Sequence, residues 1–464
     1  MQSIASHRRP SDERAYVAEL IERIVRECPE RVPTSEDERK AQELMSAELA
    51  RLGLAIEEHP FAFNDNLYAN LVLHFGLATA GTAVSGLFPL AGLLLHLTAG
   101  GSYLADSARR AYVLRRLLGF KPARNILATL PAKGEPKLRI VLAAHADAAF
   151  TGLLFSPPMV KRMAGRRLPG MLERFMALAT YSNFALAGFD LLRVFLGPLT
   201  LPLRPVEALL TVPSALTFLI NAEVALRKRV VPGANDNLSG VAALPVLATR
   251  LAAVKPPEVE LVFAVTGCEE ASMGGADALA RDRLKEWDRA RTVVLALDSI
   301  ANGELRYIDI EGEVVRRPAP SWLIETMDEV ARSEPRFRDV TGYTPPVGGT
   351  DAAAFLAHGY DSIALICVDE ELGCPRQYHL PTDDPEHLEL DPLMKSIDFA
   401  ERFVHAVIRR RLGVEVHAKA AAPKSPRKAS ARPSKRAEAD APPSSATASA
   451  RPRKSRKPKA AVED

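Results

Sequence analysis

Short apolar runs alternate along the chain with longer segments in which apolar residues recur every three to four positions. The runs 138–144 (LRIVLAA) and 259–265 (VELVFAV) are typical of buried strands, and the longer segments are typical of helices that cover a sheet. Further strands are predicted over 54–61, 125–130, 292–297 and 363–368, and helices over 35–52, 238–254, 276–287, 321–332 and 392–410. This alternation predicts an α/β fold with three layers, in which a mostly parallel mixed sheet is flanked by helices.

Four longer apolar stretches interrupt this pattern, over residues 67–85, 87–104, 175–201 and 206–226. Each comes close to the roughly 20 residues that cross a hydrocarbon core. Turns rich in glycine and proline divide the stretches into two pairs, which predicts two hydrophobic helical hairpins inserted at 66–108 and 151–231. We therefore expect membrane association through 67–104 and 175–226. Amphipathic helices that cap the soluble domain or dip into one leaflet are the alternative.

Charged residues qualify this interpretation and suggest an orientation. Some polar side chains of the second pair would be costly in mid-membrane: Asp190, Arg193, Asn221 and Glu223. Basic clusters at 109–121, 161–167 and 227–229 flank the hairpins on the side where they begin and end, and the positive-inside rule places that side in the cytoplasm. The first 20 residues lack an apolar core, so no cleavable signal peptide is expected. We expect the soluble domain to face the cytoplasm.

Composition adds one further division of the chain. The 464 residues are 47% hydrophobic and 25% charged, which excludes wholesale disorder, and four cysteines exclude a disulfide scaffold. The net charge of +3 hides a tail, 419–464, with 13 basic and four acidic residues and no aromatic residue. The tail is expected to be disordered. It would either tether anionic lipid or nucleic acid electrostatically or stay solvated without a specific partner. Residues 1–418 would form one interrupted domain.

Polar residues follow consecutive apolar runs at the point where each predicted strand ends. The run 138–144 leads into His145 and Asp147, the run 259–265 leads into Glu269 and Glu270, and the run 292–297 leads into Asp298. Open α/β sheets place their sites beyond the carboxyl ends of their strands. We expect these side chains to lie close together.

Two loops complete a set of metal-ligand types. His145, Asp236, Glu270, Asp298 and His379 together offer two imidazoles and three carboxylates. These are too few for two separate zinc sites of four ligands each, but they suffice for a pair that shares one bridging carboxylate and one water. Each residue alone is more often a cap, turn or surface residue. Their joint order at strand exits and loops of one sheet favours the metal site.

Two carboxylates beside the candidate ligands have other expected roles. Asp147, two residues beyond His145, is placed to orient the His145 imidazole. Glu269 and Glu270 are adjacent at a strand end and should point differently, so one can bind metal while the other accepts a proton from the metal-bound water.

At this point the sequence resembles a known family, the zinc-dependent aminopeptidases of family M28. The resemblance rests on HAD (145–147), PGANDNLSGVA (232–242), GCEEASMGGADALA (267–280), LDS (297–299), GGTDAAAF (348–355) and YHLPTDDPEHL (378–388), in family order. It implies a zinc aminopeptidase-like fold and two zinc ions per chain. His145 and Asp298 would bind one zinc, Glu270 and His379 the other, and Asp236 would bridge them. Glu269 would be the general base, and Asp147 would orient His145.

The substrate side is less constrained. Asp351 and Tyr378 lie in the matching motifs and are the candidates for substrate contact. Leu380 stands where the family often has Thr or Ser, and Ala352 stands where it often has His. These departures leave the metal ligands intact and put the substrate preference in doubt.

Three classes of function remain open. The favoured one is a membrane-associated dizinc exopeptidase, most simply an aminopeptidase acting on peptides. A carboxypeptidase or a glutaminyl cyclase-like relative is the second, and a catalytically silent membrane scaffold is the third. The complete ligand set and Glu269 count against the scaffold. The sequence leaves the oligomeric state open.

Overall fold

The computed structural model describes residues 12–164, 174–346 and 348–416. The predicted disordered tail, the predicted lack of a signal peptide and part of the basic cluster at 161–167 fall wholly or partly outside these ranges and stay predictions.

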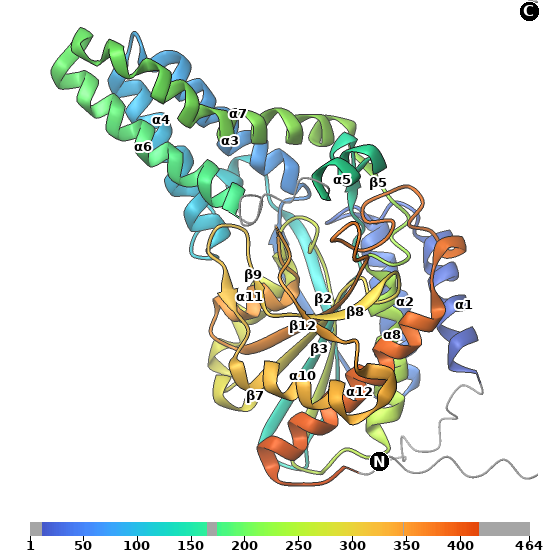
Figure 1. The fold of residues 1–464 in the computed structure, drawn as a ribbon. Coiled ribbons are helices and arrows are strands. Elements are labelled where there is room, and N and C mark those ends of the chain that lie inside the picture. Colours follow the sequence, from blue (N-terminus) through green and yellow to red (C-terminus); the bar gives the residue numbers. More distant parts are fainter. Residues whose placement is uncertain (1–11, 165–173, 347, 417–464) are drawn as a thin grey trace, which may run out of the picture. The chain divides into compact units, whose positions relative to one another are not determined.

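One mixed sheet of eight strands organises the described residues (Figure 1), in the order β1-β2-β6-β3-β7-β12-β8-β11. The strands are β1 (Ala55–Phe63), β2 (Lys121–Leu130), β3 (Leu138–His145), β6 (Val259–Thr266), β7 (Thr292–Leu297), β8 (Glu304–Ile308), β11 (Thr341–Tyr343) and β12 (Asp361–Val368). Strands β6, β3, β7 and β12 run parallel in the centre, and β2 and β8 flank them in antiparallel register. Two small two-stranded sheets pair β4 (Phe150–Thr151) with β5 (Arg229–Val230) and β9 (Ile310–Glu311) with β10 (Arg317–Pro318).

Helices cover both faces of the sheet, which makes the three predicted layers. Ile140 and Leu142 of β3 belong to the larger core, and the intervening Val141 and Ala143 belong to the smaller core on the opposite face. The larger core is covered by α1 (Glu13–Glu27), α2 (Glu36–Arg51), α8 (Leu238–Ala252), α10 (Ser321–Ser333) and α12 (Leu390–Leu412). The smaller one is covered by α9 (Gly274–Asp282) and α11 (Asp351–Ala357). The predicted fold class is confirmed.

The two predicted hairpins are helical and pack together. The first consists of α3 (Leu67–Ser85) and α4 (Pro89–Ser107). The second consists of α6 (Phe175–Leu196) and α7 (Arg204–Arg227), joined by the 3-10 turn η5 (Gly197–Leu203) and preceded by the short helix α5 (Pro157–Ala164). Helix α3 contacts α4 and α7, and α6 contacts the same two helices, so the hairpins form one four-helix bundle (Figure 1).

The bundle has polar side chains inside and apolar side chains outside. The Nδ1 atom of His96 lies 2.7 Å from Asp190 Oδ2, and Arg193 forms ion pairs with Asp190 and Glu207. All four side chains are buried. The outward side chains include Leu87, Leu94, Leu192, Phe195, Leu199, Leu209 and Leu219, all at least 46% exposed. Two of the charges that would be costly toward lipid, Asp190 and Arg193, are therefore paired within the bundle.

By length and composition alone, two helical stretches are long and apolar enough to cross a membrane: Leu67–Ser85 and the run Phe175–Arg227. In their most apolar windows, 39% and 28% of the residues are buried. A helix in the core of a soluble protein is mostly buried, so these stretches differ from core helices.

Candidate metal centre

Five predicted ligands meet at the carboxyl ends of the central strands. His145 ends β3, Glu270 follows β6, Asp298 follows β7, Asp236 lies just before α8, and His379 lies in the loop after β12. Parallel strands present their carboxyl ends on the same edge of a sheet, which is why residues up to 234 positions apart converge here.

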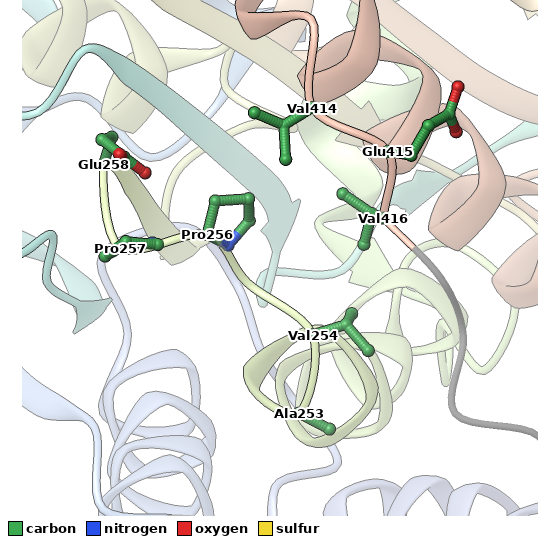
Figure 2. A pocket seen from close by; sticks show the side chains of 8 residues that line it. All are labelled: Ala253, Val254, Pro256, Pro257, Glu258, Val414, Glu415 and Val416. Carbon is green, nitrogen blue, oxygen red and sulfur yellow. The ribbon is translucent and has the colours of Figure 1, made fainter.

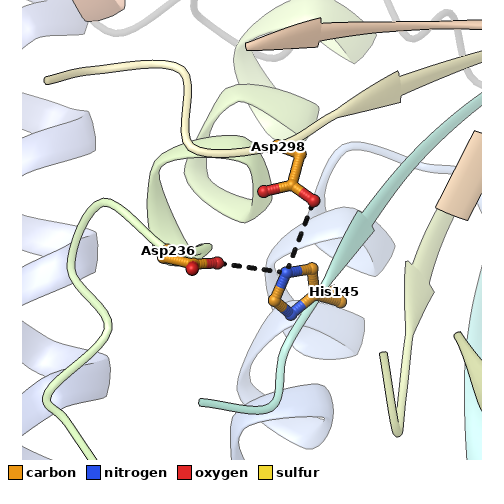
Figure 3. Close-up of side chains that lie close together, drawn as sticks. All are labelled: His145, Asp236 and Asp298. Atoms are coloured by element: carbon orange, nitrogen blue, oxygen red, sulfur yellow. Dashed lines mark ion pairs between the residues drawn. The ribbon is translucent and has the colours of Figure 1, made fainter. Parts of the chain in front are cut away.

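Asp236 stands between the two histidines. Its Oδ1 atom lies 3.3 Å from His145 Nε2, and its Oδ2 atom lies 3.3 Å from His379 Nε2. Asp298 Oδ2 is 3.8 Å from His145 Nε2 (Figure 3), and Glu270 Oε1 is 3.7 Å from His379 Nε2. Three groups of three potential ligands result. Two of them, His145–Asp236–Asp298 and Asp236–Glu270–His379, share Asp236, and the third is His145–Glu269–Glu270.

The donor set fits metal ions. His145 Nε2 is buried and has no hydrogen-bond partner among the described residues, although carboxylate oxygens surround it at 3.3–3.8 Å. A buried imidazole nitrogen in this setting is a ready ligand. Three protein ligands to one ion, with water as the fourth, are the ligand number of catalytic rather than structural zinc sites.

The electrostatics also favour cations. Burial raises the pKa of the Glu269 and Glu270 carboxyls well above their ordinary value, and neighbouring carboxylates add to the effect. Burial, with a contribution from Asp236, raises the pKa of Asp298 to about 7. Asp236 differs, because hydrogen bonds with the two histidines outweigh burial and lower its pKa. Bound cations would stabilise the ionised form of all these carboxylates.

Asp147 supports the loop that carries the two glutamates. Its Oδ1 atom accepts a hydrogen bond from the Glu269 amide at 3.1 Å, and its Oδ2 atom accepts one from the Glu270 amide at 2.8 Å. The carboxylate is also 3.5 Å from His145 Nδ1, which lies 3.2 Å from the Asp147 backbone carbonyl oxygen. Asp147 therefore contacts the candidate ligand His145 and also fixes the backbone of Glu269 and Glu270.

Glu269 reaches into the same cluster from the side of His145. Its Oε2 atom lies 3.8 Å from His145 Nε2, and the side chain is buried. Glu270 points toward His379 instead. The adjacent glutamates thus diverge.

The two candidate substrate residues occupy different surroundings. Asp351 is buried at the start of α11, accepts a hydrogen bond from the Thr266 hydroxyl at 2.5 Å, and keeps Oδ1 without a partner among the described residues. Tyr378 is half-buried, with its ring centroid 3.9 Å from that of His379 and 6.0 Å from that of Phe155. Tyr378 therefore lies directly beside a candidate ligand, whereas Asp351 lies beneath the strand ends.

Several residues that hold the site were not predicted. The Asp383 carboxylate accepts the amides of Asn235 at 2.7 Å and Asp236 at 3.0 Å. Arg31, fully buried, donates to the carbonyl oxygens of Ala146 and Pro232. Asp383 stands within the YHLPTDD motif and could have been noticed there. Arg31 lies more than 100 residues from these two partners, and the sequence around it gives no sign of the contact.

A surface hollow of about 590 Å³ lies elsewhere (Figure 2). It is lined by residues 253, 254, 256–258 and 414–416. The hollow is next to the start of β6, at the opposite end of that strand from Glu269, and contains none of the candidate ligands.

Comparisons with known proteins bear on the fold and the family. Among solved structures, a zinc aminopeptidase from Bacillus subtilis superposes with a TM-score of 0.51 at 15% identity, covering 86% of this chain and 96% of that one. An aminopeptidase from Aneurinibacillus sp. strain AM-1 has a TM-score of 0.49 at 15% identity (88% and 98% covered). A glutaminyl cyclase from Fimbriiglobus ruber has a TM-score of 0.49 at 13% identity (86% and 96% covered). The comparison with curated proteins finds no match.

The family model of peptidase family M28 matches residues 222–404. The matched range includes Asp236, Glu269, Glu270, Asp298 and His379 and begins after His145. This match and the shared fold confirm the resemblance seen in the motifs: residues 222–404 are similar to peptidase family M28.

Proposed function

We propose that this protein is a membrane-associated exopeptidase that uses two zinc ions to release the N-terminal residue of peptides. One observation carries the proposal: the two carboxylate oxygens of Asp236 face different histidines, each of which has a second carboxylate nearby. This is the layout of a pair of metal ions bridged by one carboxylate. Residues 1–418 would form the peptidase domain, with the bundle as its two insertions.

The ligand roles follow from the distances. His145 and Asp298 would hold one zinc, Glu270 and His379 the other, and Asp236 would bridge. Bound there, the zinc pair would acidify a shared water and polarise the scissile carbonyl. Glu269 would then take the proton of that water and pass it to the leaving amine, because its carboxylate reaches the cluster without belonging to either bridged group.

Preference for a free amino terminus is the least constrained part of the proposal. A substrate ammonium group needs an acidic anchor, and the cluster is rich in buried carboxylates. Carboxypeptidase or cyclase chemistry would use the same ligands, so these alternatives are separated by the substrate that is turned over.

The bundle supports membrane association. Its ion pairs are inside, its large apolar side chains are outside, and most residues of its apolar windows are not buried. A bundle in lipid needs this arrangement, because intramembrane charges pair with one another and face the bundle interior. The cytoplasmic position of the peptidase domain remains part of the proposal.

Metal analysis combined with paired substrates tests the peptidase proposal. The purified protein should hold about two zinc ions and cleave aminoacyl substrates with a free amino group but not their N-blocked counterparts. Glu269→Ala should lower kcat by about 10²–10⁴-fold, the range expected for a general base. Glu286→Ala, which removes an exposed glutamate, is the matched control. Unchanged turnover in Glu269→Ala would refute the mechanism.

Other outcomes identify the alternatives. Cleavage at free carboxyl termini indicates a carboxypeptidase, ring closure of N-terminal glutamine indicates a cyclase, and zinc binding without turnover indicates a scaffold. A separate experiment tests membrane association: the protein should stay in the membrane fraction when membranes are washed with alkaline carbonate. Serine at Leu191, Leu192, Phe195 and Leu199, all exposed on the bundle, should move it toward the soluble fraction. Quantitative recovery of the parent protein in the soluble fraction would reject membrane association.

A further inference from the structure

The first inserted helix brings a hydroxyl group to the metal centre. Tyr68 is the second residue of α3, directly after the chain leaves β1 and enters the bundle. Its side chain is buried, and its hydroxyl oxygen lies 3.4 Å from His379 Nδ1. The two residues are 311 positions apart in the sequence.

The contact is on the nitrogen of His379 that faces away from the other candidate ligands. His379 Nε2 points at Asp236 and Glu270, at 3.3 and 3.7 Å. If Nε2 binds zinc, Nδ1 carries the hydrogen, and this N–H donates a hydrogen bond to the Tyr68 oxygen. Histidine ligands usually donate their second N–H in this way, which fixes the tautomer and the orientation of the ring.

The surroundings hold Tyr68 and His379 in place. The Tyr68 ring meets Phe150 and Phe155 edge-on, with centroids 6.1 and 6.2 Å away. Phe155 in turn lies against the His379 ring, with centroids 4.4 Å apart. The start of α3 is fixed as well, because the Asn66 side chain accepts a hydrogen bond from the Ala69 amide.

The backbone conformation of His379 needs contacts from outside its own loop. Its φ is +55°, in the left-handed region that residues with a Cβ atom rarely adopt. This conformation costs free energy, and it persists only where contacts with surrounding residues hold it in place. Tyr68, Phe155 and Tyr378 form those surroundings.

We propose that Tyr68 is a positioning residue for His379, so that the first insertion is a structural part of the metal centre. The inference rests on the proposed function, since it assigns Tyr68 to the zinc held by Glu270 and His379. The bundle would then also affect the metal centre, because a displacement of α3 would alter the affinity for one zinc of the pair.

Zinc titration of Tyr68→Phe tests the inference, because this variant removes the hydroxyl and keeps the ring. We expect the metal-free variant to melt within a few degrees of the parent. One of the two zinc ions should bind about 10–100-fold more weakly in competition with a chelator, the range found for lost partners of ligand histidines. At limiting zinc, kcat should fall while KM stays the same. Tyr307→Phe is the matched control, since it removes the hydroxyl of another buried tyrosine, on β8, which donates to Asp328 of α10.

A double-variant cycle distinguishes an effect of Tyr68 through His379 from a general loss of structure. In a His379→Ala background, Tyr68→Phe should cause no further loss of zinc affinity. Parental affinity for both zinc ions in Tyr68→Phe would overturn the inference, as would a raised KM with unchanged zinc binding, which would make the hydroxyl a substrate contact. If the parent protein itself binds no zinc, the proposed function fails first, and the two failures are thus distinguishable.

Discussion

The guanidinium group of Arg115 and the carboxylate of Asp106 form a fully buried ion pair with two hydrogen bonds, of 2.7 and 2.8 Å. Asp106 is near the end of α4, and Arg115 lies in the short 3-10 turn η2 (Leu114–Leu118) that follows. The remaining amino group of Arg115 donates to the carbonyl oxygen of Ala271 at 2.7 Å. Ala271 directly follows Glu270, so this pair joins the end of the first hairpin to the loop of the candidate metal centre.

Replacing Arg115 with methionine should therefore destabilise the protein and loosen this loop. The change leaves Asp106 charged, buried and unpaired, which costs about 3–5 kcal/mol for comparable pairs. Denaturant unfolding in mild detergent measures the loss. Arg116→Met, at the exposed neighbouring position, should stay within about 0.5 kcal/mol of the parent.

The double variant Asp106→Leu/Arg115→Met sharpens the test. Removing both charges should recover part of the stability, because no unpaired charge remains. Activity should stay low, because the Ala271 carbonyl still lacks its donor. Equal recovery of stability and activity would show that the loop does not depend on this bond.

Asp147→Asn should impair the metal centre without large unfolding. An amide side chain has one acceptor oxygen, whereas Asp147 accepts from two backbone amides with its two oxygens. The Asn NH₂ group would face one of those N–H donors, and His145 would lose a nearby negative charge. Zinc affinity or kcat should fall about 10–100-fold, as measured by chelator competition and initial rates. Asp391→Asn, at an exposed position, is the control, and parental rates in Asp147→Asn would contradict this role.

The sequence was sufficient to predict the sheet centre and the convergence of the candidate ligands, because both depend on local patterns. His145 ends β3, Asp298 directly follows β7, and Glu269 comes three residues after the end of β6. Parallel strands bring their carboxyl ends together whatever the rest of the chain does. The edge strand β11 and its neighbour β8 were not predicted, since they are short and only partly apolar. The predicted helix 276–287 ends as an α-helix at Asp282, with a 3-10 turn after it.

Contacts between remote segments were beyond the sequence. Tyr68 belongs to an apolar run and has no feature that marks it as a neighbour of His379. Asp190 looked costly in a membrane helix because its partner His96, 94 positions away, cannot be recognised before the packing of the helices is known. Such residues depend on tertiary packing, which a single sequence shows only through strong motifs.

Arg193→Leu should weaken the bundle, because it leaves Asp190 and Glu207 buried without their shared partner. Breaking one side of such a network costs several kcal/mol, while the parent network need not be a net gain over an apolar core. The apparent melting temperature of the detergent-solubilised protein should drop, and Leu192→Ala, at an exposed position, should change it little. An unchanged melting temperature in Arg193→Leu would mean that the ion pairs are not formed in solution.

His405 should make stability depend on pH on the acid side. Its imidazole is buried in α12, its Nε2 atom lacks a hydrogen-bond partner among the described residues, and burial with the nearby Arg402 lowers its pKa to about 4. The unfolded chain has a histidine pKa near 6.5. Below that pH the unfolded state takes up a proton that the folded state does not, so stability is lost as the pH falls from about 6.5 to about 4, by at most about 3 kcal/mol.

Urea unfolding at pH 7 and pH 4.5 tests this dependence. His405→Leu should lose less stability between the two pH values than the parent, whereas His387→Leu, which removes an exposed imidazole, should follow the parent. Parallel pH curves for His405→Leu and the parent would contradict the lowered pKa.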